Sequence, residues 1–380
     1  MIVAGVLCGT SLDGIDVAIV DVRRAAPRYA LTTLAFATVP FAPAMRARLL
    51  EAVAPRPLDG PAFGALHADL GDAFGEAVRS VAAGRRLDLV ASHGVTIAHD
   101  GAAHRTLQLG DAFRIRERAQ ATVVYDFRAA DCAAGGHGAP LVPYLDVMMF
   151  GSQTEERVAL NLGGIANLTV LPKAGTAAVA FDTGPANLPL DTYVRLRRIG
   201  AAPYDRDGAF AQRGAVDAGL LAHLLAEPYF ALAPPKSTGR ERFGEIFVQQ
   251  HRAALDGLSP EDALATLTAA TVHSIAASIL RFAPAAAAVI AGGGGVHNAA
   301  IMNGLRRALP ATRIETTAAY GMDPDAKEAI LFAILGRELI AGRAANLPAV
   351  TGARGPRLLG ALAPHDFAQL SAVLQGEEQQ

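Results

Sequence analysis

The amino-acid sequence predicts an α/β protein built from two domains. Short runs rich in β-branched residues alternate along the chain with stretches of helical periodicity. The chain has 380 residues, 51% of them hydrophobic, whereas one domain typically holds about 100–200 residues. A strand, a glycine turn and a second strand occur in each half, and this repetition suggests a duplicated domain.

The first half opens with a predicted hairpin. Residues 2–7 and 15–22 are β-rich and are joined by a short connection that ends in Asp13-Gly14. A parallel crossover needs about a dozen residues or more, so the two strands are expected to be antiparallel. Residues 62–83 place apolar side chains at helical spacing. Short strands are expected at 87–91 and 122–125.

The middle of the chain repeats this theme. Residues 133–140 are small and glycine-rich, and we expect the chain to cross between domains there. Beyond them, the strands 159–162 and 165–171 flank Gly163-Gly164. The second half thus contains the same strand–glycine–strand unit as the first.

Two helices and a frayed end are predicted in the last third of the chain. One helix covers 262–282, with Asp262 as its N-cap. The other covers 325–340 and follows the capping signal Asp323-Pro324. Residues 376–380 are expected to be a frayed terminus.

Charge and cysteine content exclude several classes of function. Lys and Arg total 34 against 36 Asp and Glu, a net charge of -2, which provides no field for nucleic acid or an anionic membrane. Cys8 and Cys132 are too few for a disulfide framework and fit a reducing cytosol; each is either a reactive thiol or a small core residue. No signal peptide is indicated, and the apolar run 283–291 is shorter than the ~20 residues of a membrane span. A cytoplasmic protein is expected.

The three lysines exclude one common nucleotide-binding loop. Lys173, Lys236 and Lys327 follow proline, proline and alanine, whereas a P-loop requires glycine before its lysine. The Gly-x-Gly-x-x-Gly pattern is also missing after the first strand, which gives a dinucleotide-binding fold little support.

Three glycine turns are candidates for holding phosphates through backbone N–H groups. Each could by itself be an ordinary turn, but each lies at the end of a predicted strand. The second is Gly163-Gly164, and the third ends in a helix whose expected cap is Asn298. The carboxylates of the first turn can hold Mg²⁺ directly or through water. The residues of the first turn are Gly9, Thr10, Ser11, Leu12, Asp13, Gly14, Ile15 and Asp16, with Asp13 and Asp16 as the metal candidates, and those of the third include Gly292, Gly293 and Gly294.

Longer motifs give a more specific signal. They are Gly9-Thr-Ser-Leu-Asp-Gly-Ile-Asp16, Thr106-Leu-Gln-Leu-Gly-Asp111, Asp126-Phe-Arg128, Ala133-Ala-Gly-Gly-His-Gly-Ala-Pro-Leu-Val-Pro143, Asn161-Leu-Gly-Gly-Ile-Ala-Asn167, Phe181-Asp-Thr-Gly-Pro185, Pro234-Pro-Lys-Ser-Thr-Gly-Arg-Glu241, Gly292-Gly-Gly294 with Asn298, and Thr351-Gly-Ala353. In these motifs, in their order and over nearly its whole length, the chain resembles the anhydro-N-acetylmuramic acid kinases.

The resemblance implies a fold, cofactors and a reaction. The fold is α/β, with two ribonuclease-H-like domains of the actin and hexokinase type whose mixed sheets flank a nucleotide cleft. The expected domains are 1–131 with about 350–380, and 132–349. The implied cofactors are ATP and Mg²⁺. Water opens the 1,6-anhydro ring at C1 while O6 receives the γ-phosphoryl group, which gives N-acetylmuramic acid 6-phosphate and ADP in peptidoglycan recycling. A homodimer is also implied.

The chemistry of this reaction requires one carboxylate base. Glycosidases use a second carboxyl group to protonate the leaving oxygen, but here the phosphoryl group caps that oxygen. One base therefore suffices. The family places it at the motif that contains Asp182, at the end of the strand 179–181; a helix-capping role is the alternative for this residue.

Further site residues follow from the resemblance. Arg128 is expected to bind the lactyl carboxylate of the sugar, because a guanidinium suits that group; an interdomain salt bridge explains it equally well. His93 is expected to touch the sugar or to be a core histidine. Glu328 matches a glutamate near ATP, although an exposed first-turn residue fits too. Gly136, His137 and Asn187 complete the expected sugar-binding set. Lys236 is expected near the cleft without a defined role.

The sequence departs from the family pattern at three positions, and two other functions stay open. Val95 and His137 each stand where the family has glutamine, and Ala186 stands where it has glycine. These changes bear on the sugar rather than on ATP, and the missing amide at Val95 removes either a sugar hydrogen bond or a domain contact. One alternative is a kinase for another anhydrosugar such as levoglucosan, which has no carboxylate for Arg128. The other is a non-enzymatic actin-like nucleotide switch, which would need neither Asp182 nor Arg128.

Overall fold

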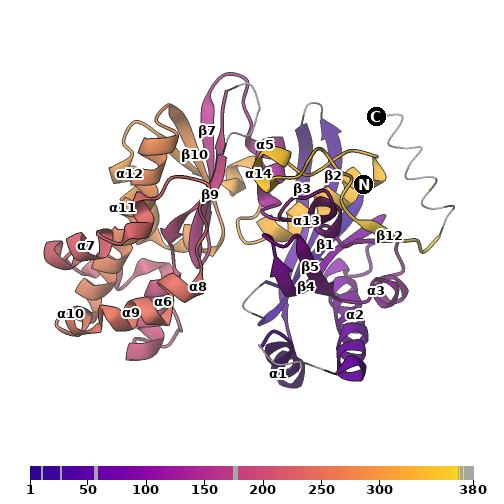
Figure 1. Ribbon diagram of the computed structural model, residues 1–380, viewed down its shortest axis with the longest axis horizontal. Helices are drawn as coiled ribbons and strands as arrows, with labels where there is room; N and C mark the ends of the chain where they lie inside the picture. The colour runs from indigo at the N-terminus through magenta and orange to yellow at the C-terminus, as the bar shows by residue number, and fades with distance from the viewer. Residues whose placement is uncertain are drawn as a thin grey trace. The chain divides into compact units, whose positions relative to one another are not determined.

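The chain divides into two compact units. The computed structural model describes residues 1–9, 12–25, 28–54, 59–173 and 179–366, together with 368 and 371. Unit 1 comprises Met1–Met149 and Ala326–Gln380, and unit 2 comprises Phe150–Asp325 (Figure 1). The chain therefore changes unit at 149/150 and 325/326, whereas the sequence placed these points at 131/132 and 349/350. Thr10, Ser11 and the predicted frayed end lie outside the described residues.

Unit 1 is built on a mixed sheet with the order β12-β6-β4-β1-β2-β3, and β5 pairs with β4 at its side. The pairs β1–β2 and β2–β3 are antiparallel, and β1–β4 and β4–β6 are parallel. The predicted opening hairpin is confirmed. The strands are β1 (Ile2–Leu7), β2 (Gly14–Ala25), β3 (Arg28–Pro40), β4 (Leu89–Asp100), β5 (Arg105–Leu109), β6 (Val123–Tyr125) and β12 (Ala361–Ala363).

Unit 2 repeats this order with five strands, β11-β10-β7-β8-β9. Here β7–β8 and β8–β9 are antiparallel, and β10 runs parallel to β7 and β11. In both sheets the first strand is central, the next two lie on one side, and the parallel strands lie on the other. The predicted α/β class with two ribonuclease-H-like units is confirmed. The strands are β7 (Glu156–Leu162), β8 (Ile165–Leu171), β9 (Val179–Pro185), β10 (Ala286–Gly292) and β11 (Arg313–Thr316).

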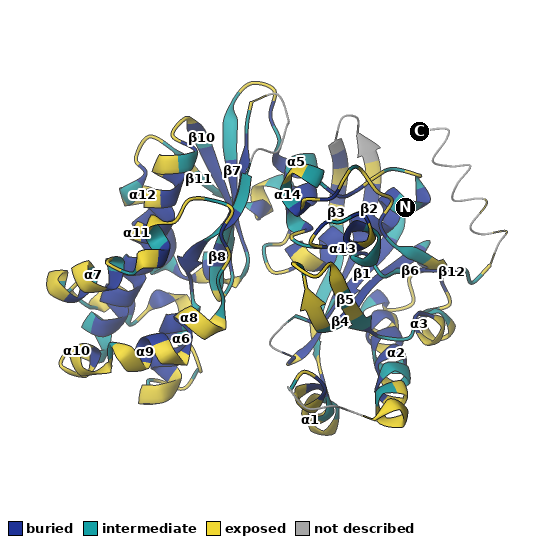
Figure 2. Cartoon of the chain, in the orientation of Figure 1, coloured by how far each residue is buried: buried dark blue, intermediate teal, exposed yellow. Residues whose placement is uncertain are grey.

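The helices of unit 1 cover a core in which the predicted helix 62–83 is confirmed as α2. The Asp59 carboxylate caps α2 by accepting a hydrogen bond from the Ala62 N–H at 2.7 Å. Leu66, Leu70 and Phe74 on its inner face are buried (Figure 2). The helices are α1 (Pro43–Ala52), α2 (Gly60–Ala82), α3 (Ala112–Ala119), α4 (Ala129–Ala133), α5 (Val142–Phe150), α13 (Lys327–Ile340) and α14 (Pro348–Thr351).

Unit 2 is organised around the long helix α11. By length and composition α11 could cross a membrane, but 78% of the apolar stretch is buried inside the structure, and its residues form part of the core of unit 2. The helices are α6 (Leu188–Arg197), α7 (Ala218–Leu225), α8 (Arg240–Phe243), α9 (Glu245–Gln250), α10 (Arg252–Asp256), α11 (Pro260–Phe282) and α12 (Ala299–Ala308).

Two predicted helix starts are wrong. Helix α11 begins at Pro260, and Ser259 rather than Asp262 is its N-cap. Asp262 instead accepts a hydrogen bond from the Ala215 N–H at 2.7 Å. Helix α13 begins at Lys327 without a side-chain cap, because the Asp323 carboxylate closes a local turn with the Asp325 N–H at 3.0 Å.

Helix α13 packs unusually close to the central strand of unit 1. A Cβ atom at Gly5 of β1 would overlap the carbonyl oxygen of Ala329. One turn of α13 thus lies directly against the strand backbone, which only glycine permits. This contact fixes the position of the first residues of α13 next to the end of β1, where the site described below is built.

Candidate active site

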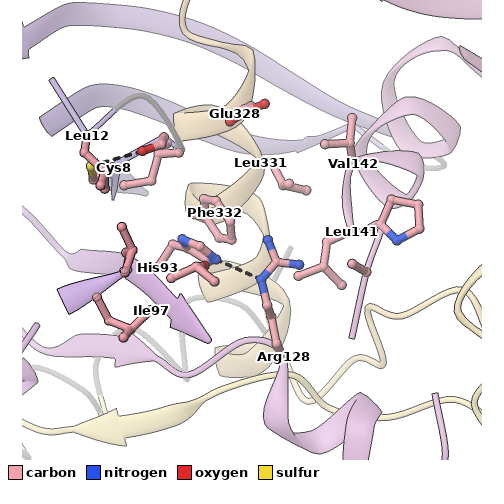
Figure 3. A pocket seen from close by; sticks show the side chains of 16 residues that line it. Cys8, Leu12, His93, Ile97, Arg128, Leu141, Val142, Glu328, Leu331 and Phe332 are labelled. Carbon is pink, nitrogen blue, oxygen red and sulfur yellow. Dashed lines mark hydrogen bonds between the residues drawn. The ribbon is translucent and has the colours of Figure 1, made fainter. Parts of the chain in front are cut away.

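Unit 1 contains a pocket of about 510 Å³ where several predicted site residues meet (Figure 3). Gly9 and Leu12 come from the connection between β1 and β2, His93 from β4, Arg128 from the residue before α4, and Glu328 from the first turn of α13. Apolar side chains, among them Ile97, Leu141 and Phe332, form much of the wall. The pocket therefore combines an apolar lining with one cation and one carboxylate.

Arg128 is fixed in place by two hydrogen bonds. Its Nε donates to Nε2 of His93 at 2.9 Å, and its Nη1 donates to the Gly138 carbonyl at 2.8 Å. His93 is buried and stacks on Phe332 with ring centroids 4.5 Å apart. Burial and the charge of Arg128 hold the pKa of His93 well below its ordinary value. The neutral imidazole thus accepts from Arg128 at Nε2 and donates from Nδ1 to the Gly94 carbonyl, 3.2 Å away.

Glu328 provides the carboxylate of the pocket. Its side chain is solvent-exposed. Desolvation by the surrounding protein is the main cause that raises its pKa, and the charge of Asp16 adds to this shift. The charges of Arg128 and Lys327 oppose it. The neighbouring Lys327 is buried and forms an ion pair with Asp146 of α5 at 2.7 Å. The side chain at 328 thus faces the pocket, and the side chain at 327 anchors the helix start.

The connection after β1 has features of an oxygen-rich ligand site. Leu12 is buried with a positive φ of 53°, and its N–H donates to the Gly9 carbonyl at 3.2 Å. Asp13 is exposed, and Asp16 accepts a hydrogen bond from Thr38 Oγ1 at 2.5 Å. Among the described residues, no group of three or more His, Cys, Asp or Glu could hold a metal ion. Mg²⁺ usually takes one or two carboxylates and keeps several waters, so Asp13 and Asp16 fit this ion.

Cys8 lies in the same connection and is a core residue. Burial, with contributions from Asp13 and Asp16, raises the pKa of its thiol to about 12. Its Sγ donates to the Gly9 carbonyl at 3.3 Å. A thiol with so high a pKa is a poor nucleophile at neutral pH, and of the two predicted interpretations for Cys8 the structure favours the buried core residue.

The glycine-rich segment 133–140 is held firmly within unit 1. Asp131 is fully buried and accepts hydrogen bonds from the Gly138 N–H at 2.8 Å, Asn346 Nδ2 at 2.7 Å and Thr351 Oγ1 at 2.8 Å. These hydrogen bonds hold the segment in place within unit 1, whereas the sequence predicted that the chain crosses between domains there. Sequence reasoning missed Asp131, because its side-chain partners are 215 and 220 positions away and give no local signal.

The remaining sugar-side predictions for unit 1 lie outside the pocket lining. Gly136 is buried, and a Cβ atom there would overlap Asp131 Oδ2. His137 is exposed beside His104, with ring centroids 6.1 Å apart. Val95 is fully buried in the core of unit 1. The departure from the family at Val95 is therefore a change in core packing, which revises the expectation that it faces the sugar.

Asp182 in unit 2 accepts one hydrogen bond at its carboxylate and one at its backbone carbonyl, and among the described residues Oδ1 has no hydrogen-bond partner. Thr238 N–H donates to Asp182 Oδ2 at 2.9 Å, and Tyr229 OH donates to the Asp182 carbonyl at 2.9 Å. Burial raises the pKa of Asp182, the Thr238 N–H opposes this shift, and the charges of Glu241 and Lys236 act in opposite directions. Asp182 is the middle residue of β9 and does not cap a helix, because α6 begins later, at Leu188.

The two glycine turns of unit 2 lie against each other. The Gly163 carbonyl accepts from Asn187 N at 3.1 Å and from Asn187 Nδ2 at 2.9 Å. A Cβ atom at Gly295 would come within 2.9 Å of Asn187 Nδ2 and the Leu162 carbonyl oxygen. Gly293 has a φ of 82° and donates its N–H to the Pro324 carbonyl at 2.9 Å. The turns after β7 and β10 thus form one backbone-lined surface, with Asn187 between them.

Asn298 has a structural role in this region. Its Oδ1 accepts from the N–H groups of Ala300 and Ile301 at 3.0 and 3.2 Å, which makes it the N-cap of α12 as predicted. Its side chain is buried. If this position binds ATP as predicted, it does so through the helix start that Asn298 caps, because the Asn298 side chain itself is already used in the cap.

Comparison with solved structures gives many distant matches, and two of them illustrate the likeness. One is the activator of the 2-hydroxyisocaproyl-CoA dehydratase from Clostridium difficile with bound ADPNP, at a TM-score of 0.42 and 11% identity, covering 88% of this chain and 94% of that one. The other is a ROK family glucokinase from Streptomyces griseus in complex with glucose and AMPPNP, at a TM-score of 0.40 and 11% identity, covering 89% of this chain and all of that one, 100%.

Comparison of sequences gives much closer matches. The family model described as anhydro-N-acetylmuramic acid kinase matches residues 1–365. A protein of that name from Xanthomonas axonopodis pv. citri (strain 306) is 46% identical over 379 residues, covering 95% of this chain and 97% of the relative. Another from Synechococcus elongatus is 41% identical over 372 residues, covering 95% and 98%. The chain therefore belongs to the anhydro-N-acetylmuramic acid kinase family and is an enzyme of the kinase class.

Proposed function

We propose that this protein uses ATP and Mg²⁺ to open 1,6-anhydro-N-acetylmuramic acid with water and to phosphorylate its O6, acting in the cytoplasm in peptidoglycan recycling. The observation that carries the proposal is the setting of Asp182. One oxygen of its carboxylate is held by the Thr238 N–H, and burial raises its pKa. A half-buried, oriented carboxylate is suited to remove a proton from a water molecule.

In this proposal Asp182 performs the acid–base part of the reaction alone. The Thr238 N–H fixes Oδ2, so the lone pairs of Oδ1 accept the proton of the attacking water. The raised pKa makes the carboxylate a stronger base than an exposed aspartate. ATP supplies the phosphoryl group that caps the leaving O6, so no second carboxylic acid is required.

Arg128 is proposed to recognise the lactyl carboxylate of the sugar. Its Nε and Nη1 already donate within the protein, and among the described residues no partner occupies Nη2, which is proposed to bind the ligand. In Figure 3 the guanidinium lies between His93 and Leu141 in the pocket. A fixed guanidinium pays little entropy to bind a carboxylate. Levoglucosan offers no such group, so this feature favours the muramic substrate.

For ATP and Mg²⁺ the candidate residues are those of the turns. Asp13 and Asp16 are proposed as metal ligands, directly or through water, and the residues 9–16 of unit 1 as a phosphate loop. In unit 2 the candidates are Gly163, Gly164 and the turn 292–294 with the start of α12. Glu328 is proposed to act near the same cofactor, and Gly136, His137 and Asn187 near the sugar. A homodimer remains a prediction that analytical ultracentrifugation can check.

The test is a reaction with a panel of sugars. The protein is incubated with ATP and either 1,6-anhydro-N-acetylmuramic acid or levoglucosan in ¹⁸O-water. Mass spectrometry should find ADP and a 6-phosphorylated product with label at C1 for the muramic sugar. Turnover of levoglucosan alone would refute the substrate. ATP hydrolysis that no sugar affects would instead support a nucleotide switch.

A variant tests the base. Asp182→Asn should lower kcat by about 10²–10⁴, the usual contribution of a positioned base, with ATP binding retained in calorimetry. Asp256→Asn, an exposed carboxylate of unit 2, is the matched control and should keep near-normal kcat. Near-normal activity of Asp182→Asn would show that the base lies elsewhere.

A further inference from the structure

Lys236 lies buried beside the proposed base. Lysine is scarce in this chain, with only Lys173, Lys236 and Lys327 among 34 basic residues. The Lys236 side chain is only 9% exposed. Burying an ammonium group is costly unless its charge is compensated, so the place where the chain buries one needs a physical reason.

The ammonium group is compensated by aromatic rings and a carbonyl. Nζ lies 4.6 Å from the ring centroid of Tyr229 and 5.8 Å from that of Phe181. It also donates to the Tyr229 carbonyl at 3.3 Å. Within the part of the chain that the structure describes, no carboxylate forms an ion pair with it. Cation–π contacts are stronger when they are desolvated, and here they hold the lysine against two particular rings.

Those two rings belong to the residues that surround Asp182. Phe181 precedes Asp182 on β9, and the Tyr229 OH donates to the Asp182 carbonyl at 2.9 Å. The backbone of Lys236 itself accepts from the Asp182 N–H at 3.2 Å. Two residues later, the Thr238 N–H donates to the Asp182 carboxylate at 2.9 Å. Lys236 is therefore tied to Asp182 from both its side chain and its backbone.

We propose that Lys236 is a positioning residue for Asp182: its ammonium group pins the segment 235–238 onto the rings of Phe181 and Tyr229, so that the backbone of this segment holds the Asp182 carboxylate in one orientation. The proposal rests on the proposed function, in which Asp182 is the base. Lys236 itself does not touch the reacting atoms in this scheme. It acts through the Thr238 N–H, whose position depends on where the lysine is anchored.

The charge of Lys236 has a second effect on the same carboxylate. Burial and the charge of Glu241 raise the pKa of Asp182, and the positive charge of Lys236 partly opposes this shift. Burial, and then Arg281 at the end of α11, lower the pKa of Lys236 itself, while Asp182 raises it. Tyr229 carries a proton at neutral pH, because burial and then Asp182 and Glu241 raise its pKa, with Arg242 opposing. The charged groups around the pair are thus Glu241, Arg242 and Arg281.

The test compares Lys236→Met with wild type by steady-state kinetics over pH. Methionine keeps the length of the side chain and removes the charge. We expect kcat to fall about 10-fold to 100-fold with both KM values within about threefold, because an oriented base acts on the transition state more than on substrate binding. The acid limb of the kcat profile should move to higher pH, because the positive charge no longer lowers the pKa of Asp182.

Two further variants make the result specific. Lys236→Arg keeps the charge and should return the acid limb to its wild-type position. Glu241→Gln removes a negative charge that raises the pKa of Asp182 and should move the limb to lower pH. A rise in the KM for the sugar at unchanged kcat would overturn the proposal, since Lys236 would then bind substrate. If Lys236→Met keeps the wild-type pH profile of kcat and only loses thermal stability, the proposal is also overturned, because the role of Lys236 would then be purely structural.

Failure of this inference can be separated from failure of the proposed function. If Asp182→Asn is inactive and Lys236→Met has a wild-type profile and kcat, only the positioning role is wrong. If Asp182→Asn is active, the base itself is misassigned. Should Lys236→Met not fold, Phe181→Leu removes one ring and keeps the charge; a wild-type kcat in that variant would overturn the proposal.

Discussion

The two units have the same strand order but differ in the connection between their first two strands. In unit 1, Leu7 and Gly14 are joined by residues 8–13, which carry a carboxylate and border the pocket. In unit 2, only Gly163 and Gly164 join β7 to β8, and their carbonyls accept hydrogen bonds from the start of α6. The same topological position thus provides side chains in one unit and backbone in the other. The two units share the framework, and the length of this connection gives each a different chemistry.

The same comparison applies to the central strands. Two positions before the end of β1 is Gly5, against which α13 packs with its backbone. Two positions before the end of β7 is Leu160, whose fully buried side chain fills the corresponding space with apolar atoms. The close approach in unit 1 brings Glu328 to the pocket.

The largest predicted effect tests this close packing. Gly5→Ala should destabilise the protein by about 3 kcal/mol or more, because the new Cβ would overlap the Ala329 carbonyl and backbone must shift. Gly163→Ala is the matched change in the other hairpin, where the atom nearest to an added Cβ would be 3.5 Å away, and should change stability by about 0.5 kcal/mol or less. Urea unfolding followed by circular dichroism measures both. Equal midpoints would contradict the difference between the units.

The next effect tests the chemistry that side chains supply in unit 1. Arg128→Lys loses the planar group that His93 and Gly138 orient. The KM for the muramic sugar should rise about 10-fold to 100-fold, equivalent to about 1.5–3 kcal/mol for hydrogen bonds to a charged group. The KM for ATP should stay within about threefold. An unchanged sugar KM would show that Arg128 serves only the internal contacts.

The smallest effect compares two first-turn carboxylates, Asp191 of α6 and Glu328 of α13. Burial raises the pKa of the half-buried Asp191 to about 7 from an ordinary value of 3.8. Between these values the folded protein binds more protons than the unfolded chain, so Asp191 makes stability fall as pH rises from 4 to 7. Asp191→Asn removes this slope; because the side chain is partly exposed and solvent screens its charge, the gain at pH 8 relative to pH 4 should be only ~1 kcal/mol.

Thermal unfolding of both variants over pH measures this effect, with a shift of ~2 °C expected for each kcal/mol in a chain of this size. Glu328→Gln is the comparison: the pKa of Glu328 is also raised, so this variant should change the slope in the same direction, but less, because the side chain is exposed. Parallel curves for wild type and Asp191→Asn would mean that Asp191 is ionised in the folded protein at neutral pH.

Local patterns predicted the opening hairpin, α2 and the strands beside the glycine turns, but not β3, β5, β11 or β12. The connection ending in Asp13-Gly14 is too short for anything but a hairpin, and the periodicity of 62–83 is long and regular. The helix starts were harder. Ser259 and Asp262 are both good caps three positions apart, and tertiary contact with Ala215 decided which one is used. Competing caps cannot be ranked without their partners.

The candidate site was predictable only in part. The residues around the pocket were found through motifs, but their mutual contacts, such as Arg128 with His93, join positions far apart in sequence. The clamp at Asp131 and the cage of Tyr229, Lys236 and Thr238 around Asp182 were not foreseen. Each depends on backbone groups, whose directions follow from the fold rather than from residue type.

The burial of two lysines has a practical consequence for chemical labelling. Lys236 and Lys327 are shielded by rings and by an ion pair, while Lys173 is exposed. An amine-reactive dye or surface linker should therefore attach at Lys173. It should react more slowly at the amino group of Met1, which donates a hydrogen bond to the Val22 carbonyl. The folded enzyme thus offers an almost single-site handle for immobilisation, and reaction at Lys236 would report local opening around the base.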